Sequence, residues 1–363
     1  MNKVIIFIKG LSWKQICLSS VVLLCLLCWG GLTAFATVKK NGLLDQNAAK
    51  RWAEGNDAAQ ISCFFTESTE IDKDKIRSFE HELDKVLLES SITAPNENAR
   101  LWVDAYSASG TITLSSDKKS LENVAAVGIG GDFFLFHPVQ LLRGAYFSGN
   151  DLMYDKVIVD EDAAWQLFGS NDVVGMAVNI GGTPHYISGV IKREEGRFQE
   201  AAGLDKTLVY VSCETLEEFG KTQGINSYEV VMPNPVKNFA YNSVKEKLGI
   251  DENHMWVVEN SARFHLKGLL TVISEFGMRS MNARAIQYPY WENVARGWED
   301  VLAVVLILQI LFLLCPAVIV VSALILSWKR RQWTWKDVGR FLVEQKDRAA
   351  DRFHSEKSKW KYF

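Results

Sequence analysis

The sequence is poor in cysteine, and this excludes a fold held together by disulfides. It has six cysteines in 363 residues. Four of them lie in long apolar runs, where a thiol behaves as a small hydrophobic side chain: Cys17, Cys25, Cys28 and Cys315. The other two, Cys63 and Cys213, could pair in an oxidising compartment or be buried thiols on separate strands, and we favour the second interpretation.

Sequence motifs for catalysis are also missing. The glycines at 169 and 175 lie six positions apart, and Met176 occupies the position where a phosphate-binding loop needs lysine. The glycines at 128–131 lack the strand–GxGxxG–helix order, so a tight turn is the better interpretation. The six histidines form no HExxH pair, and GxSxG is absent. The acidic run 160–162 is interpreted as a helix N-cap. We therefore expect no catalytic, cofactor-binding or metal site, and a protein that is not an enzyme.

Charge is distributed unevenly along the chain. The net charge is −3, but residues 1–14 carry three lysines and no acid, and residues 329–363 carry eleven basic residues against five acidic ones. Subtracting these +3 and +6 contributions from −3 leaves −12 for residues 15–328. Basic ends around an acidic middle argue against nucleic-acid binding and for a membrane protein whose two ends face the cytosol.

Two uncharged apolar runs support a membrane protein. Residues 15–38 and 301–327 contain 24 and 27 residues without a charge, and a membrane-spanning helix needs about 20. Their basic flanks predict a cytoplasmic N-terminus (1–14), a cytoplasmic tail (328–363) and an extracytoplasmic domain (39–300). The first run, with Ala34-Phe35-Ala36 near its end, also fits a cleavable signal peptide, which would export the same domain. The prediction is a lipid-embedded, multi-pass protein of the cell membrane.

Polar and aromatic residues mark the ends and interior of the second run. Tyr290, Trp291 and Trp298 are predicted to form an aromatic belt at the outer membrane interface. Gln309 and Pro316 indicate either a helix–helix contact or a tolerated kink. The basic tail has an apolar stripe, so it could lie on the inner leaflet or dock on a partner.

The middle of the chain shows the pattern of an α+β protein. In chain order it predicts strand 60–66, helix 70–90, a hairpin of strands 99–106 and 111–115 turning at 107–110, then strand 228–232, helix 235–248 and strand 255–259. This order predicts an interrupted βαβ-type subdomain. An inserted, mostly-β subdomain occupies about 124–222, and residues 39–58 are expected to be a membrane-proximal linker. We also expect residues 39–290 to fold alone, even with reductant present.

Two segments of the insertion resemble a known family. These are VGIGGDFFLFHPVQLLRGAYFSGND (127–151) and VIVDEDAAWQLFGSNDVVGMAVNIGGTPHYISGVI (157–191). The matching positions, in order, are Gly131-Asp132-Phe133, Gly144, Phe147, Asp151, Leu167-Phe168-Gly169, Val174-Gly175 and Gly189-Val190. The sequence resembles the extracytoplasmic core domain of the MacB/FtsX-like ABC transporter permeases.

The resemblance implies a role and partners. Members of that family continue into two further spans and a segment that contacts an ATPase, whereas this sequence holds two spans and no ATPase motif. The resemblance therefore implies a subunit or accessory of an ABC-type export or transmembrane-signalling complex, with a separate ABC ATPase and FtsX-type permease. The alternative is a free-standing, membrane-anchored binding or sensor module.

Overall fold

A computed structural model describes residues 12–53, 57–94, 96, 99–279 and 286–329. The chain divides into two compact units, and each is described by itself. One unit contains the apolar parts of two long helices (residues 1–33 and 307–363), and the other comprises residues 34–306. The predictions for residues 1–11 and for the tail from 330 onward lie outside the described residues.

The long helices, α2 (Trp13–Gly42) and α12 (Tyr290–Lys329), have the length and apolar composition needed to cross a membrane. Within the apolar unit, Gln309 Nε2 on α12 donates a hydrogen bond of 3.0 Å to Thr33 Oγ1 on α2. The helix–helix contact proposed for Gln309 is therefore confirmed. Pro316 lies inside α12.

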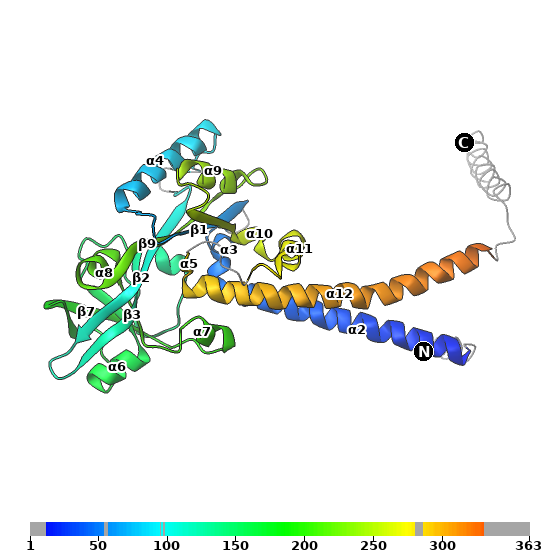
Figure 1. Cartoon of the computed structure of the whole chain (residues 1–363), viewed down its shortest axis with the longest axis horizontal. Helices are drawn as coiled ribbons and strands as arrows, with labels where there is room; N and C mark the ends of the chain where they lie inside the picture. Colours follow the sequence, from blue (N-terminus) through cyan, green and yellow to red (C-terminus); the bar gives the residue numbers. More distant parts are fainter. Residues whose placement is uncertain (1–11, 54–56, 95, 97–98, 280–285, 330–363) are drawn as a thin grey trace, which may run out of the picture. The chain divides into compact units, whose positions relative to one another are not determined.

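In the described residues of the second unit, ten strands form one mixed sheet, shown in Figure 1. The order is β10-β1-β9-β2-β3-β8-β5-β7-β4, with β6 paired to β2 and β7. The strands are β1 (Ala58–Phe65), β2 (Val103–Ser115), β3 (Ser120–Gly131), β4 (Leu141–Gly144), β5 (Lys156–Asp160), β6 (Ala177–Ile180), β7 (Thr183–Ile191), β8 (Leu208–Ser212), β9 (Lys221–Pro233) and β10 (Met255–Glu259). The predicted α+β class is confirmed, as are the order β1-α4-β2 and the later order β9-α9-β10, but the two strands predicted at 99–106 and 111–115 are the single strand β2.

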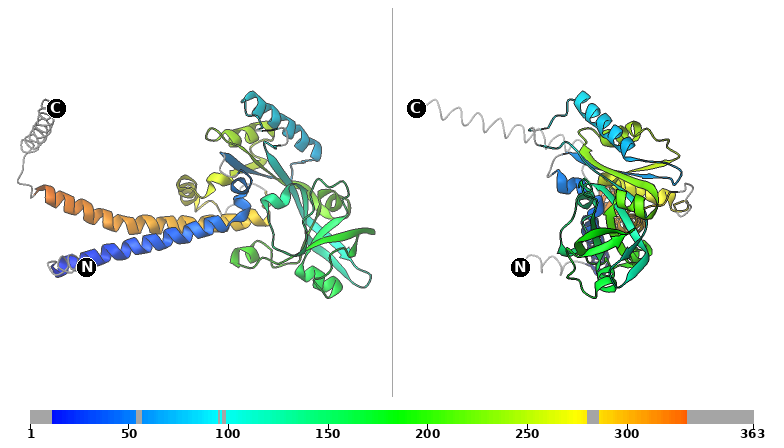
Figure 2. Two further views of the ribbon diagram at one scale, coloured as in Figure 1. Left: turned by 180° about the vertical axis from the view of Figure 1, so that it is seen from behind. Right: turned by 90° about the vertical axis from the view of Figure 1, so that its left-hand side faces the viewer.

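Helices cover both faces of this sheet. The shorter ones are η1 (Leu44–Gln46), α3 (Ala48–Trp52), α4 (Lys73–Glu89), α5 (Phe133–Phe136), α6 (Glu161–Phe168), α7 (Arg197–Ala201), α8 (Cys213–Phe219), α9 (Phe239–Lys247), α10 (Asn260–Arg263) and α11 (Leu266–Glu275). Helices α4 and α9 pack on the β1–β9 end, and α6 and α8 on the β3–β7 end (Figures 1 and 2). The opposite face carries α3, α5 and the start of α12. Strands at the centre are therefore buried on both faces.

The predicted hairpin turn at 107–110 is wrong. Strand β2 runs unbroken through these residues and turns into β3 at Ser116–Lys119. The small side chains allow close packing against β9: Ser107 and Ser227 hydroxyls lie 2.6 Å apart, and a Cβ on Gly110 would lie 2.4 Å from a β9 carbonyl oxygen. Close strand packing and a turn favour the same small residues, and the pattern alone does not distinguish them.

Two further expectations are corrected. Residues 39–58 are not a linker, because η1 and α3 lie there and Ala48 and Ala49 are buried. Helix α9 begins at Phe239 rather than at Pro235, since Asn238 just before it adopts φ +65° and interrupts helical geometry. The borders of the inserted subdomain stay a prediction.

The two cysteines outside the apolar runs are free and buried. Cys63 lies on β1 as expected, but Cys213 opens α8 instead of lying on a strand. Burial raises the pKa of the Cys213 thiol to about 12, with Glu217 acting in the same direction. Neither thiol is placed for redox chemistry.

Candidate functional site

Strand alternation places polar groups inside the second unit. On β1, Ile61 and Cys63 point into the apolar core under α4 and α9, so Ser62 points to the opposite face. In the register of β1 and β9, Ser62 lies directly opposite Glu229. Ser62 Oγ donates a hydrogen bond to Glu229 Oε1, and both residues are buried. The Glu229 carboxylate therefore lies on the face of the sheet that carries α3, α5 and the start of α12.

A histidine reaches this carboxylate from the end of β3. Gly131 closes the strand at φ +63°, where a Cβ would lie 2.6 Å from the Asp104 carbonyl oxygen. The short helix α5 follows, anchored by the fully buried rings of Phe133 and Phe136. His137 is the next residue and has no exposed surface. The Gly-Asp-Phe motif that carries the family resemblance therefore also positions His137.

His137 lies between two carboxylates. Its Nδ1 is 3.0 Å from Asp45 Oδ1 on η1, and its Nε2 hydrogen-bonds Glu229 Oε2. Burial by itself would lower the pKa of His137, but the charges and hydrogen bonds of Glu229 and Asp45 outweigh it and raise that pKa to about 9. His137 is thus a cation at neutral pH, with both ring nitrogens donating.

An arginine continues the polar contacts toward α12. Arg263 on α10 donates two parallel bonds to Glu292, of 2.6 and 2.7 Å, and its Nε donates to Glu299 Oε1 at 2.6 Å. Its third partner is Asn260 Oδ1 at 3.2 Å. Burial would lower the pKa of Arg263, but Glu292 and Glu299 outweigh it and hold that pKa above its usual range.

Asn260 joins these two clusters, since its Nδ2 donates to Ser62 Oγ at 2.6 Å. The result is one unbroken chain of hydrogen bonds and ion pairs, here called the base network. It consists of Asp45, His137, Glu229, Ser62, Asn260, Arg263, Glu292, Glu299 and Arg279, whose guanidinium also binds Glu299. One end lies three residues after α2 and the other lies on α12. The base network therefore connects both long helices through the sheet.

Aromatic rings surround the base network. Trp291 is 2% exposed and packs against Phe133 and His137, with ring centroids 5.5 and 4.0 Å apart. The predicted interfacial belt is therefore wrong for Trp291, which is a core residue. It is also wrong for Tyr290, whose hydroxyl is 2.8 Å from that of Tyr210 on β8. Trp298 remains half-buried beneath Lys39 Nζ, 4.8 Å from its ring centroid.

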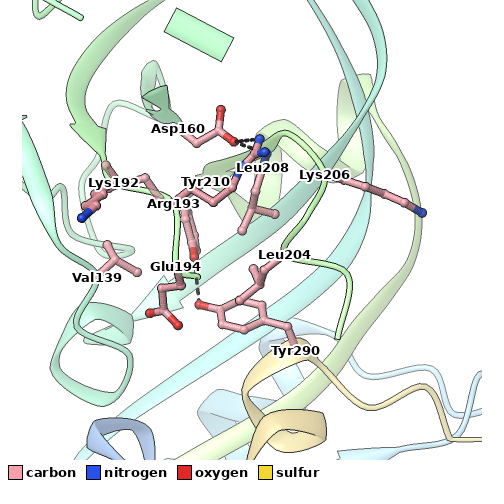
Figure 3. A pocket seen from close by; sticks show the side chains of 11 residues that line it. Val139, Asp160, Lys192, Arg193, Glu194, Leu204, Lys206, Leu208, Tyr210 and Tyr290 are labelled. Atoms are coloured by element: carbon pink, nitrogen blue, oxygen red, sulfur yellow. Dashed lines mark hydrogen bonds and ion pairs between the residues drawn. The ribbon is translucent and has the colours of Figure 1, made fainter. Parts of the chain in front are cut away.

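A small pocket lies where α12 meets the inserted strands (Figure 3). At one end Asp160 accepts hydrogen bonds of 3.1 Å from Arg193 and from the Leu208 amide, and at the other the Tyr210 and Tyr290 hydroxyls meet. The pocket leaves about 20 Å³ for the centres of water molecules, room for about one water. The pocket is a closely packed contact between α12 and the strands β5 and β8, and it is too small for an organic ligand.

The acidic run 160–162 forms the helix N-cap that the sequence predicts. Asp160 caps α6 by accepting a 2.7 Å bond from the Ala163 amide, and Gly169 ends that helix at φ +73°. Within the described part of the chain, no group of three or more His, Cys, Asp or Glu side chains is placed to hold a metal ion.

Sequence reasoning missed the base network because its members are far apart along the chain. A signal does exist: Gln60 and Ser62 interrupt the otherwise apolar strand β1, and Glu229 interrupts the apolar run 228–232 of β9. Such residues must find partners when buried. Which partners they find depends on the strand order, which the pattern does not contain.

Comparison with known proteins agrees with this architecture. Residues 50–242, more than half of the chain, match the family model of the MacB-like periplasmic core domain. The macrolide export ATP-binding/permease protein MacB of Chromobacterium violaceum is 30% identical over 78 residues, 21% of this chain and 12% of that protein. MacB of Agrobacterium fabrum is 29% identical over 97 residues, 26% of this chain and 15% of that protein. The chain thus matches only a small part of these relatives' length.

Solved structures of the same kind are also similar. The periplasmic region of MacB from Actinobacillus actinomycetemcomitans is 16% identical, with a TM-score of 0.38, over 60% of this chain and 92% of that one. The extracellular domain of the noncanonical ABC-type transporter YknZ from Gram-positive bacteria is 16% identical, with a TM-score of 0.34, over 55% and 99%. The family match includes Ser62, His137 and Glu229 of the base network, whereas Asp45 and the members from Asn260 onward lie outside it. This membrane protein with an extracytoplasmic α+β domain belongs to the family of the MacB-like periplasmic core domain.

Proposed function

We propose that this protein is a subunit of an ABC-type export or transmembrane-signalling complex, in which it passes conformational changes between the membrane and its outer domain. Its partners in this proposal are a separate ABC ATPase and an FtsX-type permease. Both termini are cytoplasmic and the two long helices each cross the membrane once. The observation that carries the proposal is the base network, because it joins the ends of both long helices to one sheet.

The energetics of buried ion pairs support a mechanical role. Removing one partner of a buried pair leaves an uncompensated charge and costs about 3–5 kcal/mol. Arg263 is held by Glu292 and Glu299 at once, and these two carboxylates lie two helical turns apart on α12. A shift of α12 along its axis would break these bonds unless α10 and the sheet moved with it. The outer domain is therefore expected to follow α12 as one body.

The test is reconstitution in nanodiscs with a candidate ATPase–permease pair. We expect the wild-type protein to change the pair's ATP hydrolysis rate, and Arg263→Lys, which keeps the charge but not the forked contact, to reduce that change. Arg100→Lys is the matched control, since Arg100 forms a single exposed ion pair with Asp132. A hydrolysis rate indifferent to the wild-type protein would favour the alternative, a free-standing binding or sensor module.

Membrane topology is tested separately. In a background with the four apolar-run cysteines replaced by alanine, Leu152→Cys should react with an impermeant thiol reagent on intact cells, because Leu152 is 92% exposed. Ser355→Cys should react only after permeabilisation. Labelling of Ser355→Cys in sealed cells would contradict the orientation.

A further inference from the structure

Helix α11 presents an apolar face that the domain core does not cover. Leu269 and Val272 pack inward, whereas Lys267, Thr271 and Glu275 are exposed and polar. Between these two sides, Leu266 and Leu270 lie one turn apart with 60% and 46% of their surface exposed. Phe276 and Met278, just after the helix, are 37% and 73% exposed. Leu266 and Leu270 thus form an exposed apolar stripe on α11, and Phe276 and Met278 add exposed apolar surface directly after the helix.

Ion pairs fix the position of α11 and residues 276–278 along the axis of α12. Arg263, before α11, and Arg279, after it, bind the two oxygens of the same carboxylate, Glu299. Arg279 also lies 3.2 Å from Asp300. Asp300 is the last charged residue before the uncharged run that starts at Val301. Both ends of the segment are therefore tied to α12 where its apolar run begins.

Neighbouring residues are those expected at a membrane surface. Lys39, the first charge after the apolar part of α2, lies over the ring of Trp298, two residues before Asp300. Paired aromatic and basic residues are typical of the headgroup region. Figure 1 shows α11 beside α12, in agreement with the contacts of Arg279.

We propose that α11 and residues 276–278 rest on the membrane, with Leu266, Leu270, Phe276 and Met278 inserted at the boundary between headgroups and acyl chains of the outer leaflet. An exposed apolar stripe beside a polar face, at the level where a spanning helix leaves water, has the properties of an interfacial helix. A surface that binds a protein partner would not need to lie at the same position along α12 as the start of the apolar run. The inference does not depend on an ABC partner, and it makes the membrane a third support of the outer domain beside the two helices.

The test uses the full chain in phosphatidylcholine nanodiscs, with the four apolar-run cysteines replaced by alanine. Met278→Cys and Leu270→Cys are each labelled with an environment-sensitive fluorophore, and the lipid is either unmodified or brominated near the top of its acyl chains. Leu152→Cys, on the inserted subdomain, is the control, with a side chain that is even more exposed, at 92% against 73% for Met278 and 46% for Leu270. All three sites are exposed, so the substitutions leave the core unchanged.

We expect brominated lipid to quench at least about half of the emission at positions 278 and 270, and to leave that at 152 unchanged. Adding Leu266→Asp and Phe276→Asp should weaken the quenching at 270. Emission at 278 and 270 that is as insensitive to brominated lipid as at 152 would overturn the proposal. If those labels were then also shielded from aqueous iodide, a protein surface would be the occupant instead.

Discussion

The core beneath α6 and α8 and the opposite face of the sheet are stabilised in different ways. The core beneath α6 and α8 is built almost entirely from valine, alanine, isoleucine and leucine. The face that carries α3, α5 and α12 contains buried charges: His137, Glu229, Arg263 and Glu292. Apolar packing tolerates small adjustments, whereas a buried ionic chain permits only arrangements in which every charge keeps its partner. The difference indicates that the inserted subdomain is a stable body and that the base network governs how the long helices attach to it.

The largest expected effect comes from shortening the outer domain by ten residues. A fragment of residues 39–300 retains Trp291, Glu292 and Glu299, whereas 39–290 removes a fully buried ring and both carboxylate partners of Arg263. We expect 39–300 to fold cooperatively with reductant present. The fragment 39–290, which the sequence pattern alone favoured, should lose at least about 5 kcal/mol of unfolding free energy. Urea denaturation followed by circular dichroism compares the two, and equal stabilities would show that α12 contributes nothing to the domain.

Breaking the base network at its centre is the next strongest change. Arg263→Met should lower the unfolding free energy of 39–300 by about 3–5 kcal/mol, because Glu292 loses its ion-pair partner while buried and Glu299 keeps only Arg279. The control Arg100→Met should cost less than about 1 kcal/mol, as expected for an exposed pair. Chemical denaturation measures both. A loss for Arg263→Met no larger than that of the control would mean that water compensates the two carboxylates.

A substitution that creates a cavity in the core beneath α6 and α8 tests how this core differs from the base network. Leu216 on α8 is fully buried and lies where Cβ atoms added to Gly110, Gly128 and Gly220 would touch it. Leu216→Ala should therefore cost about 2–5 kcal/mol of unfolding free energy. This cost should be the same at pH 6 and pH 9, unlike that of changes in the base network. A pH-dependent cost would mean that the two regions are coupled.

The pH dependence of stability tests His137. Its pKa is raised to about 9 in the folded domain, above the usual value of 6.5, so protonated His137 stabilises the fold fully below about pH 6.5. This stabilisation, at most about 3 kcal/mol, should disappear as the pH rises from 6.5 through 9.

The variant His137→Gln should lose that pH dependence. His185→Gln is the matched control, since His185 is equally buried but contacts the Thr183 carbonyl and the Thr215 hydroxyl. Thermal unfolding of 39–300 between pH 6 and 9.5 provides the comparison. Unchanged pH dependence in His137→Gln would place the titrating group elsewhere.

The smallest effect is expected at a helix end in the inserted subdomain. Gly169 adopts φ +73°, and an added Cβ would meet no atom within 4 Å. Gly169→Ala should therefore cost only about 1 kcal/mol, the backbone penalty of a left-handed alanine. A much larger loss in thermal unfolding would reveal a contact at this position beyond the backbone.

Local features were predictable from the sequence, and long-range pairing was not. Helix α6 with its Asp160 cap, the glycine turn between β6 and β7, and the two apolar helices follow from patterns within a few residues. The small residues of β2 were misinterpreted as a turn because strand packing selects the same residue types. The base network joins residues up to 198 positions apart. Its existence depends on β1 lying between β9 and β10, which local patterns do not specify.

Non-additivity between the ends of the base network tests the central claim most directly. Asp45 and Glu299 share no partner among the described residues, since Asp45 binds His137 and Glu299 binds the two arginines. In a double-mutant cycle of Asp45→Asn and Glu299→Gln in the fragment 39–300, a network that acts as one unit should give an interaction energy above about 0.5 kcal/mol. The control cycle of Asp45→Asn with Asp160→Asn should be additive within about 0.3 kcal/mol. Additivity in both cycles would contradict the claim that the base network couples the two long helices.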